Sequence, residues 1–429
     1  MKHIYTSIDI GSDTIKIVVC ELFQNKLNLL SASSFKAKGI KKGLITDIDD
    51  ASISVRQAFN EVEQMLGIKI NQVIASVPSY LAEYSFVKNE MELEKEEGEV
   101  ITKEDIANVL NVNIDLGSAK EIVTVLPIDF KVDDEEFIKD PTGLTGKRLG
   151  SRSIVITTPK KNIVSVVSLL ENIGIDVLDI SLNNIGDLYA FKTKDMEKRL
   201  GVIINIGSET TSISLYNKNV IIKSSLINMG GKNIDNDISY MYKVDSKTAN
   251  ELKHKFALAH KRNANISDIY EVDTTTGEMI KINQFEISEV VSSRIEEILT
   301  LAKKEIGNLT SKKIDYIIVT GGTSNMADIE YIASDVLGKD VSLGNIKLLG
   351  IRNNKYSACV GNVVYYISKL KLKGQNITMV DENNQIKLAN SKRNSNDVSN
   401  ASMLGKLYDY FFKEWGGINN VWIRNGSNC

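Results

Sequence analysis

One short motif occurs twice in the chain: residues 8–14 read I-D-I-G-S-D-T and residues 204–210 read I-N-I-G-S-E-T. Five of the seven positions are identical, and the other two are Asp/Asn and Asp/Glu pairs. Both copies lie in runs rich in Ile, Val and Thr, so each predicts a strand, a tight glycine turn and a second strand. A separation of roughly 200 residues is too long for a solenoid repeat. It indicates two related domains that begin with the same hairpin.

The residues at the two turns suit a phosphate group. Gly11 and Gly207 carry no side chain, so a ligand can approach the backbone there. Hydroxyl side chains follow each glycine, and successive backbone N–H groups in such a turn form a concave site for an anion. One such hairpin is more often an ordinary turn. Two copies facing each other across a cleft would hold the phosphates of one nucleotide between two domains.

A third segment, residues 315–325, reads D-Y-I-I-V-T-G-G-T-S-N. A buried strand leads into Gly321 and Gly322, and residues 327–337 have apolar side chains at helical spacing. The two glycines would let a base or ribose lie against the backbone of this strand-to-helix turn. Other helices are predicted at 51–66, 162–173 and 285–306, and a strand at 72–77. This mixture is typical of α/β domains.

Composition limits the class of protein. The chain has 429 residues, of which 42% are apolar and 25% charged, as in a soluble protein of several domains. Its 52 basic and 55 acidic residues argue against a nucleic-acid binder, and no nucleic-acid partner is expected. Three distant cysteines form no disulfide framework and favour a reducing compartment. No run approaches the ~20 apolar residues of a spanning helix.

These motifs resemble the nucleotide core of the actin, Hsp70 and sugar-kinase superfamily, to which M-G-G at 229–231 also conforms. A more specific match is the segment 125–152, which reads V-L-P-I-D-F-K-V-D-D-E-E-F-I-K-D-P-T-G-L-T-G-K-R-L-G-S-R. It is similar to the signature of the FtsA family, bacterial actin-like cell-division proteins. The resemblance covers about residues 4–370. It implies an α/β, actin-like two-domain ATPase fold with an inserted subdomain 1C and a C-terminal amphipathic helix.

The resemblance also implies domain boundaries and a site for ATP and Mg²⁺. The boundaries are 1–81, 161–194 and 355–370 for subdomain 1A, 82–160 for 1C, 195–231 and 310–354 for 2A, 232–309 for 2B, 371–401 for a disordered linker and 402–415 for a membrane-targeting helix. The implied nucleotide-binding residues are Asp9, Gly11, Ser12, Thr14, Lys16, Asn205, Gly207, Ser208, Thr210, Thr211, Gly230, Gly231, Lys232, Lys253, Gly321, Gly322, Thr323 and Met326. Asp9 would hold Mg²⁺ indirectly, through water.

Three positions depart from the family pattern. The second phosphate motif usually has Asp where this chain has Asn205. Asn supplies a neutral oxygen, so it contributes less negative charge to a hydrated Mg²⁺. The family usually has Glu in place of Asn250 and Gly in place of Asp328. We therefore expect ATP binding with at most weak ATPase activity.

The C-terminal region has a different composition. Residues 374–401 are rich in Asn, Ser, Lys and Asp and predict a disordered linker. Residues 402–415 then read S-M-L-G-K-L-Y-D-Y-F-F-K-E-W, a helix of ~21 Å that is too short for a bilayer core of ~30 Å. One broad face would carry Met403, Leu404, Leu407, Tyr408, Phe411, Phe412 and Trp415. Such a helix suits the membrane interface, although it could also dock on the protein's own core.

The leading hypothesis is therefore an adaptor. It would bind ATP, self-associate into filaments, and tether the tubulin-like protein FtsZ to the cytoplasmic face of the cell membrane at the division site. In this family the C-terminal tail of FtsZ binds subdomain 2B, where Arg294 is the predicted contact unless it is simply a solvated helix charge. The alternatives are an MreB-like cytoskeletal ATPase and a sugar-kinase-type phosphotransferase. An Hsp70-like chaperone is disfavoured, because the chain after residue 373 is too short for a substrate-binding domain.

Overall fold

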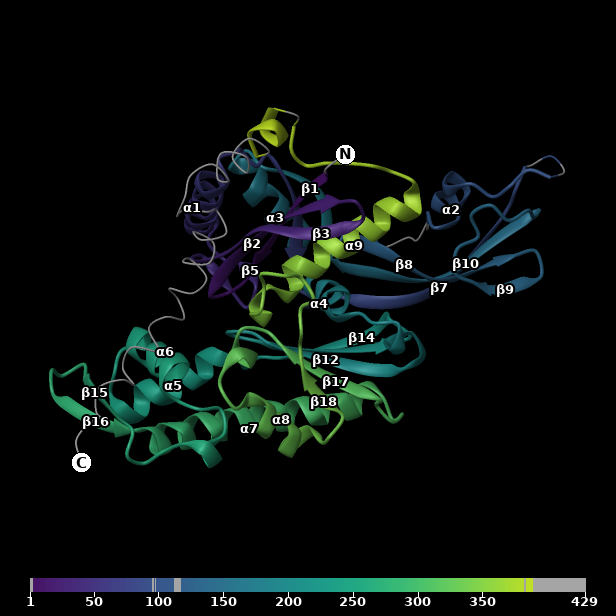
Figure 1. The fold of residues 1–429 in the computed structure, drawn as a ribbon. Coiled ribbons are helices and arrows are strands. Elements are labelled where there is room, and N and C mark those ends of the chain that lie inside the picture. The colour runs from purple at the N-terminus through teal and green to yellow at the C-terminus, as the bar shows by residue number, and fades with distance from the viewer. Residues whose placement is uncertain (1–2, 95, 97, 112–116, 382, 389–429) are drawn as a thin grey trace.

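The structure is a computed structural model that describes residues 3–94, 96, 98–111, 117–381 and 383–388. Two domains lie one above the other, and a smaller subdomain projects from the upper one (Figure 1). The upper, first domain has a five-stranded sheet in the order β11-β6-β1-β2-β3. Its strands are β1 (His3–Ile10), β2 (Thr14–Phe23), β3 (Lys26–Lys36), β6 (Gln72–Val77) and β11 (Asp176–Leu182).

The lower, second domain repeats this sheet, with the order β14-β13-β12-β17-β18. Its strands are β12 (Leu200–Ile206), β13 (Thr211–Asn217), β14 (Val220–Ile227), β17 (Tyr316–Thr320) and β18 (Val341–Leu343). In both sheets the motif strand pairs antiparallel with the next strand and parallel with a later one: β1 with β2 and β6, and β12 with β13 and β17. The prediction of two related domains that open with the same hairpin is confirmed.

Each of the two large sheets is covered by helices that turn their apolar side chains toward it. The first domain has α1 (Ile48–Leu66), α3 (Lys160–Asn172), α4 (Asn183–Phe191) and α9 (Ser357–Lys373), and the second has α5 (Gly231–Tyr242), α6 (Ser246–Lys255), α7 (Gln284–Leu309) and α8 (Ile329–Leu337). Asp47 caps α1 by accepting the N–H groups of Asp49 and Asp50, and Gly67 ends it with a φ of 68°. The predicted helices and the strand at 72–77 are confirmed.

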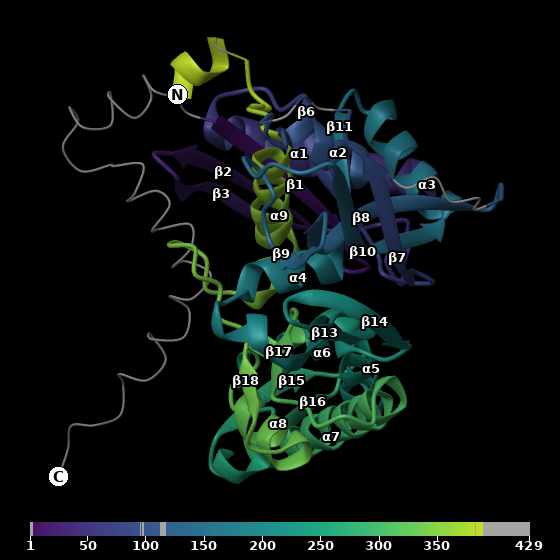
Figure 2. The ribbon, with the colours of Figure 1, turned by 90° about the vertical axis from the view of Figure 1, so that its right-hand side faces the viewer.

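Side chains of β12 alternate between two cores. Ile203 belongs to the core of the first domain, whereas Val202 and Ile204 pack in the core of the second domain with α7. The domains are joined twice by the chain, through α4 and α9, and Figure 2 shows α4 between them. These helices cross where Gly361 lies so close to Gly186 that an added Cβ would sit 1.6 Å from the Gly186 carbonyl oxygen. Only glycine permits this approach.

The inserted subdomain consists of a four-stranded sheet and one helix. Its strands are β7 (Glu83–Glu92), β8 (Lys120–Val132), β9 (Glu135–Ile138) and β10 (Arg148–Pro159), in the order β7-β10-β8-β9, and its helix is α2 (Lys103–Val109). A separate small core contains Ile106, Phe130 and Leu149. The remaining strands form two short hairpins, β4 (Ile40–Lys41) with β5 (Leu44–Ile45) and β15 (Ile269–Asp273) with β16 (Met279–Asn283).

The predicted disordered linker at 371–401 is wrong in its first part. The helix α9 continues to Lys373, and the chain then returns to β1, where the Met379 N–H donates to the Ile4 carbonyl at 2.9 Å. Met379 is only 3% exposed. The strand β6 pairs with β1 only from Ser7 to Asp9, so the backbone groups of Ile4 remain for the returning chain. The rest of the linker and the predicted membrane helix at 402–415 lie outside the described residues.

Candidate functional site

The two glycine hairpins meet at one short loop between the domains. Lys42 and Gly43 connect β4 to β5 in the first domain. The Gly43 N–H donates to the Ser12 hydroxyl at 2.8 Å, and the Lys42 N–H donates to the Glu209 carboxylate at 2.7 Å. Since Ser12 belongs to the first turn and Glu209 to the second, the structure brings both turns together. We call this region the hairpin junction.

The first turn is closed by its own backbone and by an ion pair. The Gly11 N–H donates to the Thr14 carbonyl at 3.1 Å, which shapes the turn. Lys16 lies 2.9 Å from the Asp9 carboxylate, and both side chains are largely buried. Burial alone would lower the pKa of Lys16, but the adjacent Asp9 carboxylate outweighs it and raises the pKa. Lys16 therefore carries a positive charge beside the turn.

The second turn is linked to the predicted connecting and adenosine segments by backbone contacts. The Gly207 carbonyl accepts from the Gly231 N–H at 2.9 Å and from the Thr323 hydroxyl at 3.2 Å. The Lys232 N–H donates to the Ser208 carbonyl at 2.8 Å. Three segments that are far apart in the sequence thus form one continuous arc, as the motifs predicted.

Lys253 and Gly321 also lie on this arc. Lys253 is 4% exposed, donates to the Gly231 carbonyl at 3.0 Å and pairs with Asp235 at 2.7 Å. Its burial lowers the pKa of its ammonium group. Gly321 has a φ of +96°, and a Cβ there would lie 2.5 Å from Asn205 Oδ1, so a side chain is excluded. Met326, by contrast, packs in the core of the second domain, and Thr211 is buried with its hydroxyl donating to the Met229 carbonyl.

The hairpin junction has the donors that a phosphate needs. The hydroxyl groups of Thr14, Ser208 and Thr210 make no hydrogen bond within the described part of the chain, and they lie beside the two turns. The ammonium group of Lys232 adds a positive charge, since its hydrogen bond with Glu209 raises its pKa. Hydroxyls, backbone N–H groups and lysines that converge on two turns that each begin with a glycine fit a polyphosphate.

Two carboxylates of this region were missed by the sequence motifs. Glu209 lies within the repeated motif, but the motif shows only that it corresponds to Asp13. Its carboxylate accepts from the Lys232 ammonium at 2.8 Å as well as from Lys42. Asp187, on α4, has no motif around it, and burial raises its pKa to about 6. Only the tertiary structure places Asp187 next to Asn205.

Comparison with known proteins identifies the fold first. The chain is similar to MreB5 of Spiroplasma citri solved with ADP, with a TM-score of 0.54 and 14% identity over 87% of this chain and 99% of that one. It is similar to a chain of a PilM–PilN type IV pilus biogenesis complex, with a TM-score of 0.56 and 12% identity over 84% and 98%. Residues 84–157 match a model described as the SHS2 domain inserted in FtsA. The fold is thus actin-like with an inserted SHS2 subdomain.

Sequence comparison then gives the family. Residues 202–361 match the model described as cell division protein FtsA. The cell division protein FtsA of Bacillus subtilis is 28% identical over 381 residues, which cover 88% of this chain and 86% of that protein. FtsA of Enterococcus hirae is 27% identical over 87% of each. The chain belongs to the FtsA family of actin-like cell division proteins, as the 125–152 signature predicted.

Replacing Glu209 by glutamine should raise the affinity of the protein for ATP roughly fivefold, because a negative charge among the phosphate donors opposes an anionic ligand. The substitution also releases Lys232 from its ion pair. Isothermal titration calorimetry measures the change. Glu271→Gln is the matched control, since Glu271 pairs with Lys281 on the β15–β16 hairpin and should leave the affinity unchanged. Weaker ATP binding by Glu209→Gln would contradict this prediction.

Proposed function

We propose that this chain binds ATP and Mg²⁺ at the hairpin junction, assembles into actin-like filaments, and tethers FtsZ to the cytoplasmic face of the membrane at the division site. The proposal rests chiefly on the continuous arc formed by Gly207, Gly231 and Thr323 beside the Gly11 turn. Family membership supports the role in cell division. The remaining steps are inferred from particular residues.

At the hairpin junction, both side chains and backbone groups would bind the nucleotide. Thr14, Ser208 and Thr210 would donate hydroxyl hydrogen bonds to phosphate oxygens, and Lys232 would offset their charge. Asp9 would orient Mg²⁺ through water while keeping its ion pair with Lys16. Bound ATP would supply a phosphoanhydride that water can cleave. The carboxylates of Asp9 and Glu209 are both engaged by lysines, which supports at most weak hydrolysis.

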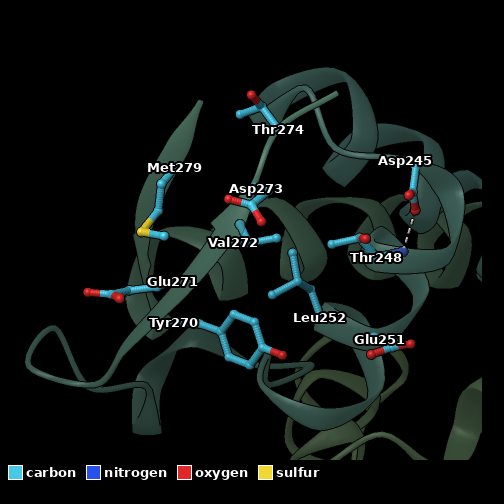
Figure 3. A pocket seen from close by; sticks show the side chains of 10 residues that line it. All are labelled: Asp245, Thr248, Glu251, Leu252, Tyr270, Glu271, Val272, Asp273, Thr274 and Met279. Carbon is cyan, nitrogen blue, oxygen red and sulfur yellow. Dashed lines mark hydrogen bonds between the residues drawn. The ribbon is translucent and has the colours of Figure 1, made fainter. Parts of the chain in front are cut away.

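Subdomain 2B would receive the FtsZ tail. A cavity of about 440 Å³ lies there between α6 and the β15–β16 hairpin (Figure 3). Its wall combines the exposed side chains of Met279 and Tyr270 with carboxylates, including Glu251 and Asp273. Exposed apolar and acidic groups together suit a peptide that carries both apolar and basic residues.

Arg294, the predicted FtsZ contact, lies on α7 and outside the residues that line this cavity. Its guanidinium forms two hydrogen bonds with Asp237 of α5, at 2.6 and 2.9 Å, and a third with Glu297. A carboxylate of the FtsZ tail would therefore have to bind the Arg294 guanidinium together with Asp237 or take the place of Asp237 there. The role of Arg294 remains a prediction.

The membrane contact would come from residues 402–415. No helix within the described residues is both long and apolar enough to cross a bilayer. A single short amphipathic helix binds reversibly, and a filament would hold many such helices at high effective concentration. Filament formation would therefore make attachment stable without a spanning segment.

The test combines the purified full chain, ATP–Mg²⁺ and a lipid monolayer, viewed by negative-stain electron microscopy. We expect filaments on the lipid, and we expect them to recruit added FtsZ. The matched comparison omits ATP, which should greatly reduce filament density. A monolayer that binds single particles with and without ATP, and never filaments, would refute the proposed assembly.

A further inference from the structure

A buried carboxylate from the first domain holds the side chain at the end of β12. Asn205 Nδ2 donates to Asp187 Oδ2 at 2.7 Å. Asp187 lies on α4 and is 1% exposed. Its other oxygen accepts from the Ser357 hydroxyl at 2.5 Å, and the Thr320 hydroxyl donates to Ser357 at 3.2 Å. The carboxylate thus connects α4, α9, β12 and β17, the four elements that meet behind the hairpin junction.

This contact determines which way the Asn205 amide points. An ionised carboxylate can only accept hydrogen bonds, so the amide nitrogen must face Asp187 and the amide oxygen must face away. That oxygen lies beside Gly321, where an added Cβ would be 2.5 Å from it. Gly321 is on the arc that also includes Gly231 and Thr323. The Asn205 oxygen is therefore an acceptor presented at the candidate site.

The contact also changes the charge on that oxygen. A hydrogen bond to an ionised acceptor is stronger than one between neutral groups, and it polarises the amide that donates it. The other charged groups that face Asp187 are Asp9 and Lys16, which form an ion pair with each other. Asp187 consequently contributes a negative charge that no neighbouring cation fully neutralises.

We propose that Asp187 is a positioning residue that replaces the carboxylate missing from the second hairpin motif. The motif has a neutral Asn205 at the end of β12, and α4 supplies the negative charge directly behind it. Asp187 orients and polarises Asn205, whose oxygen accepts a hydrogen bond from the hydration shell of Mg²⁺ when nucleotide is bound. This inference rests on the proposed nucleotide binding at the hairpin junction.

The structure suggests a charge-exchange experiment with Asp187→Asn, Asn205→Asp and the double variant. Each is close in shape to the original residue, so packing is preserved. ADP affinity is measured by calorimetry with Mg²⁺ and with EDTA, together with the melting temperature. ADP is used because it avoids hydrolysis during the titration.

For Asp187→Asn we expect the gain in ADP affinity due to Mg²⁺ to fall roughly fivefold, while affinity in EDTA changes little. Asn205→Asp alone should lower the melting temperature by several degrees, because it places two carboxylates at hydrogen-bond distance from each other. The double variant restores a single negative charge. It should recover both the melting temperature and the effect of Mg²⁺.

Asp179→Asn is the control for losing a largely buried carboxylate, since Asp179 pairs with Lys369 away from the junction. It should alter stability but not the effect of Mg²⁺. An unchanged Mg²⁺ effect in Asp187→Asn, or a double variant no better than Asn205→Asp, would overturn the inference while leaving nucleotide binding intact. If the unaltered protein does not bind ADP at all, the proposed function fails, and this inference fails with it.

Discussion

Replacing Gly207 by valine should reduce ATP binding by at least about a hundredfold, because the new side chain would occupy the space through which a phosphate would approach the second turn in the proposed site. A Cβ at Gly207 would meet one protein atom within 4 Å, the Thr210 carbonyl oxygen at 3.0 Å. The fold can therefore accept the substitution with a small local shift. Calorimetry or filter binding with ATP–Mg²⁺ measures the loss.

Gly307→Val provides the matched control. Gly307 lies near the end of α7, and a Cβ there has nothing within 4 Å. The same substitution at that position should leave ATP affinity unchanged, and circular dichroism should show that both variants are folded. Near-normal ATP affinity in a folded Gly207→Val protein would rule out the second turn as a phosphate site.

Deleting residues 402–415 should abolish sedimentation of the protein with liposomes. The predicted apolar face of this segment offers several large side chains, and each fully buried side chain of this kind contributes about 1.5–3 kcal/mol on transfer from water. Lys406 and Lys413 balance Asp409 and Glu414, so attachment should depend little on anionic lipid or on salt. Sedimentation with zwitterionic and anionic vesicles, at low and high salt, checks both points.

Two single substitutions sharpen this test. Phe411→Glu places a charge on the apolar face and should release most of the protein, whereas Lys406→Gln on the opposite arc should not. Full sedimentation of the deletion variant would show that another part of the chain binds lipid. Strong salt dependence would show that electrostatic attraction, and not apolar insertion, drives attachment.

The parts of the site that could be predicted from sequence are those whose conformation depends on residues adjacent in the chain. The repeated turn depends on Gly11 and Gly207 within apolar β runs, and Gly321 follows a buried strand, so local patterns were sufficient. The signature at 125–152 added the inserted subdomain. In each case one short segment carries the information.

The parts that could not be predicted depend on pairs of residues far apart in the sequence. Asp187 and Ser357 are separated by 170 positions, and neither is part of a motif. Arg294 forms its ion pair with Asp237 only because α5 and α7 pack together. The polar composition of the segment after Lys373 predicts disorder. Its few apolar residues, such as Met379, nevertheless suffice because β1 leaves backbone groups for it.

If residues 402–415 bind lipid as proposed, the docking of Met379 on β1 limits the distance between the first domain and the bilayer. With Leu388 buried on the first domain, only residues 389–401 separate it from the predicted anchor. At 3.3–3.6 Å per residue, a segment of this length spans no more than about 45 Å even when it is fully extended. Every subunit of a filament would then have to turn its first domain toward the lipid, leaving subdomain 2B free to reach FtsZ deeper in the cell.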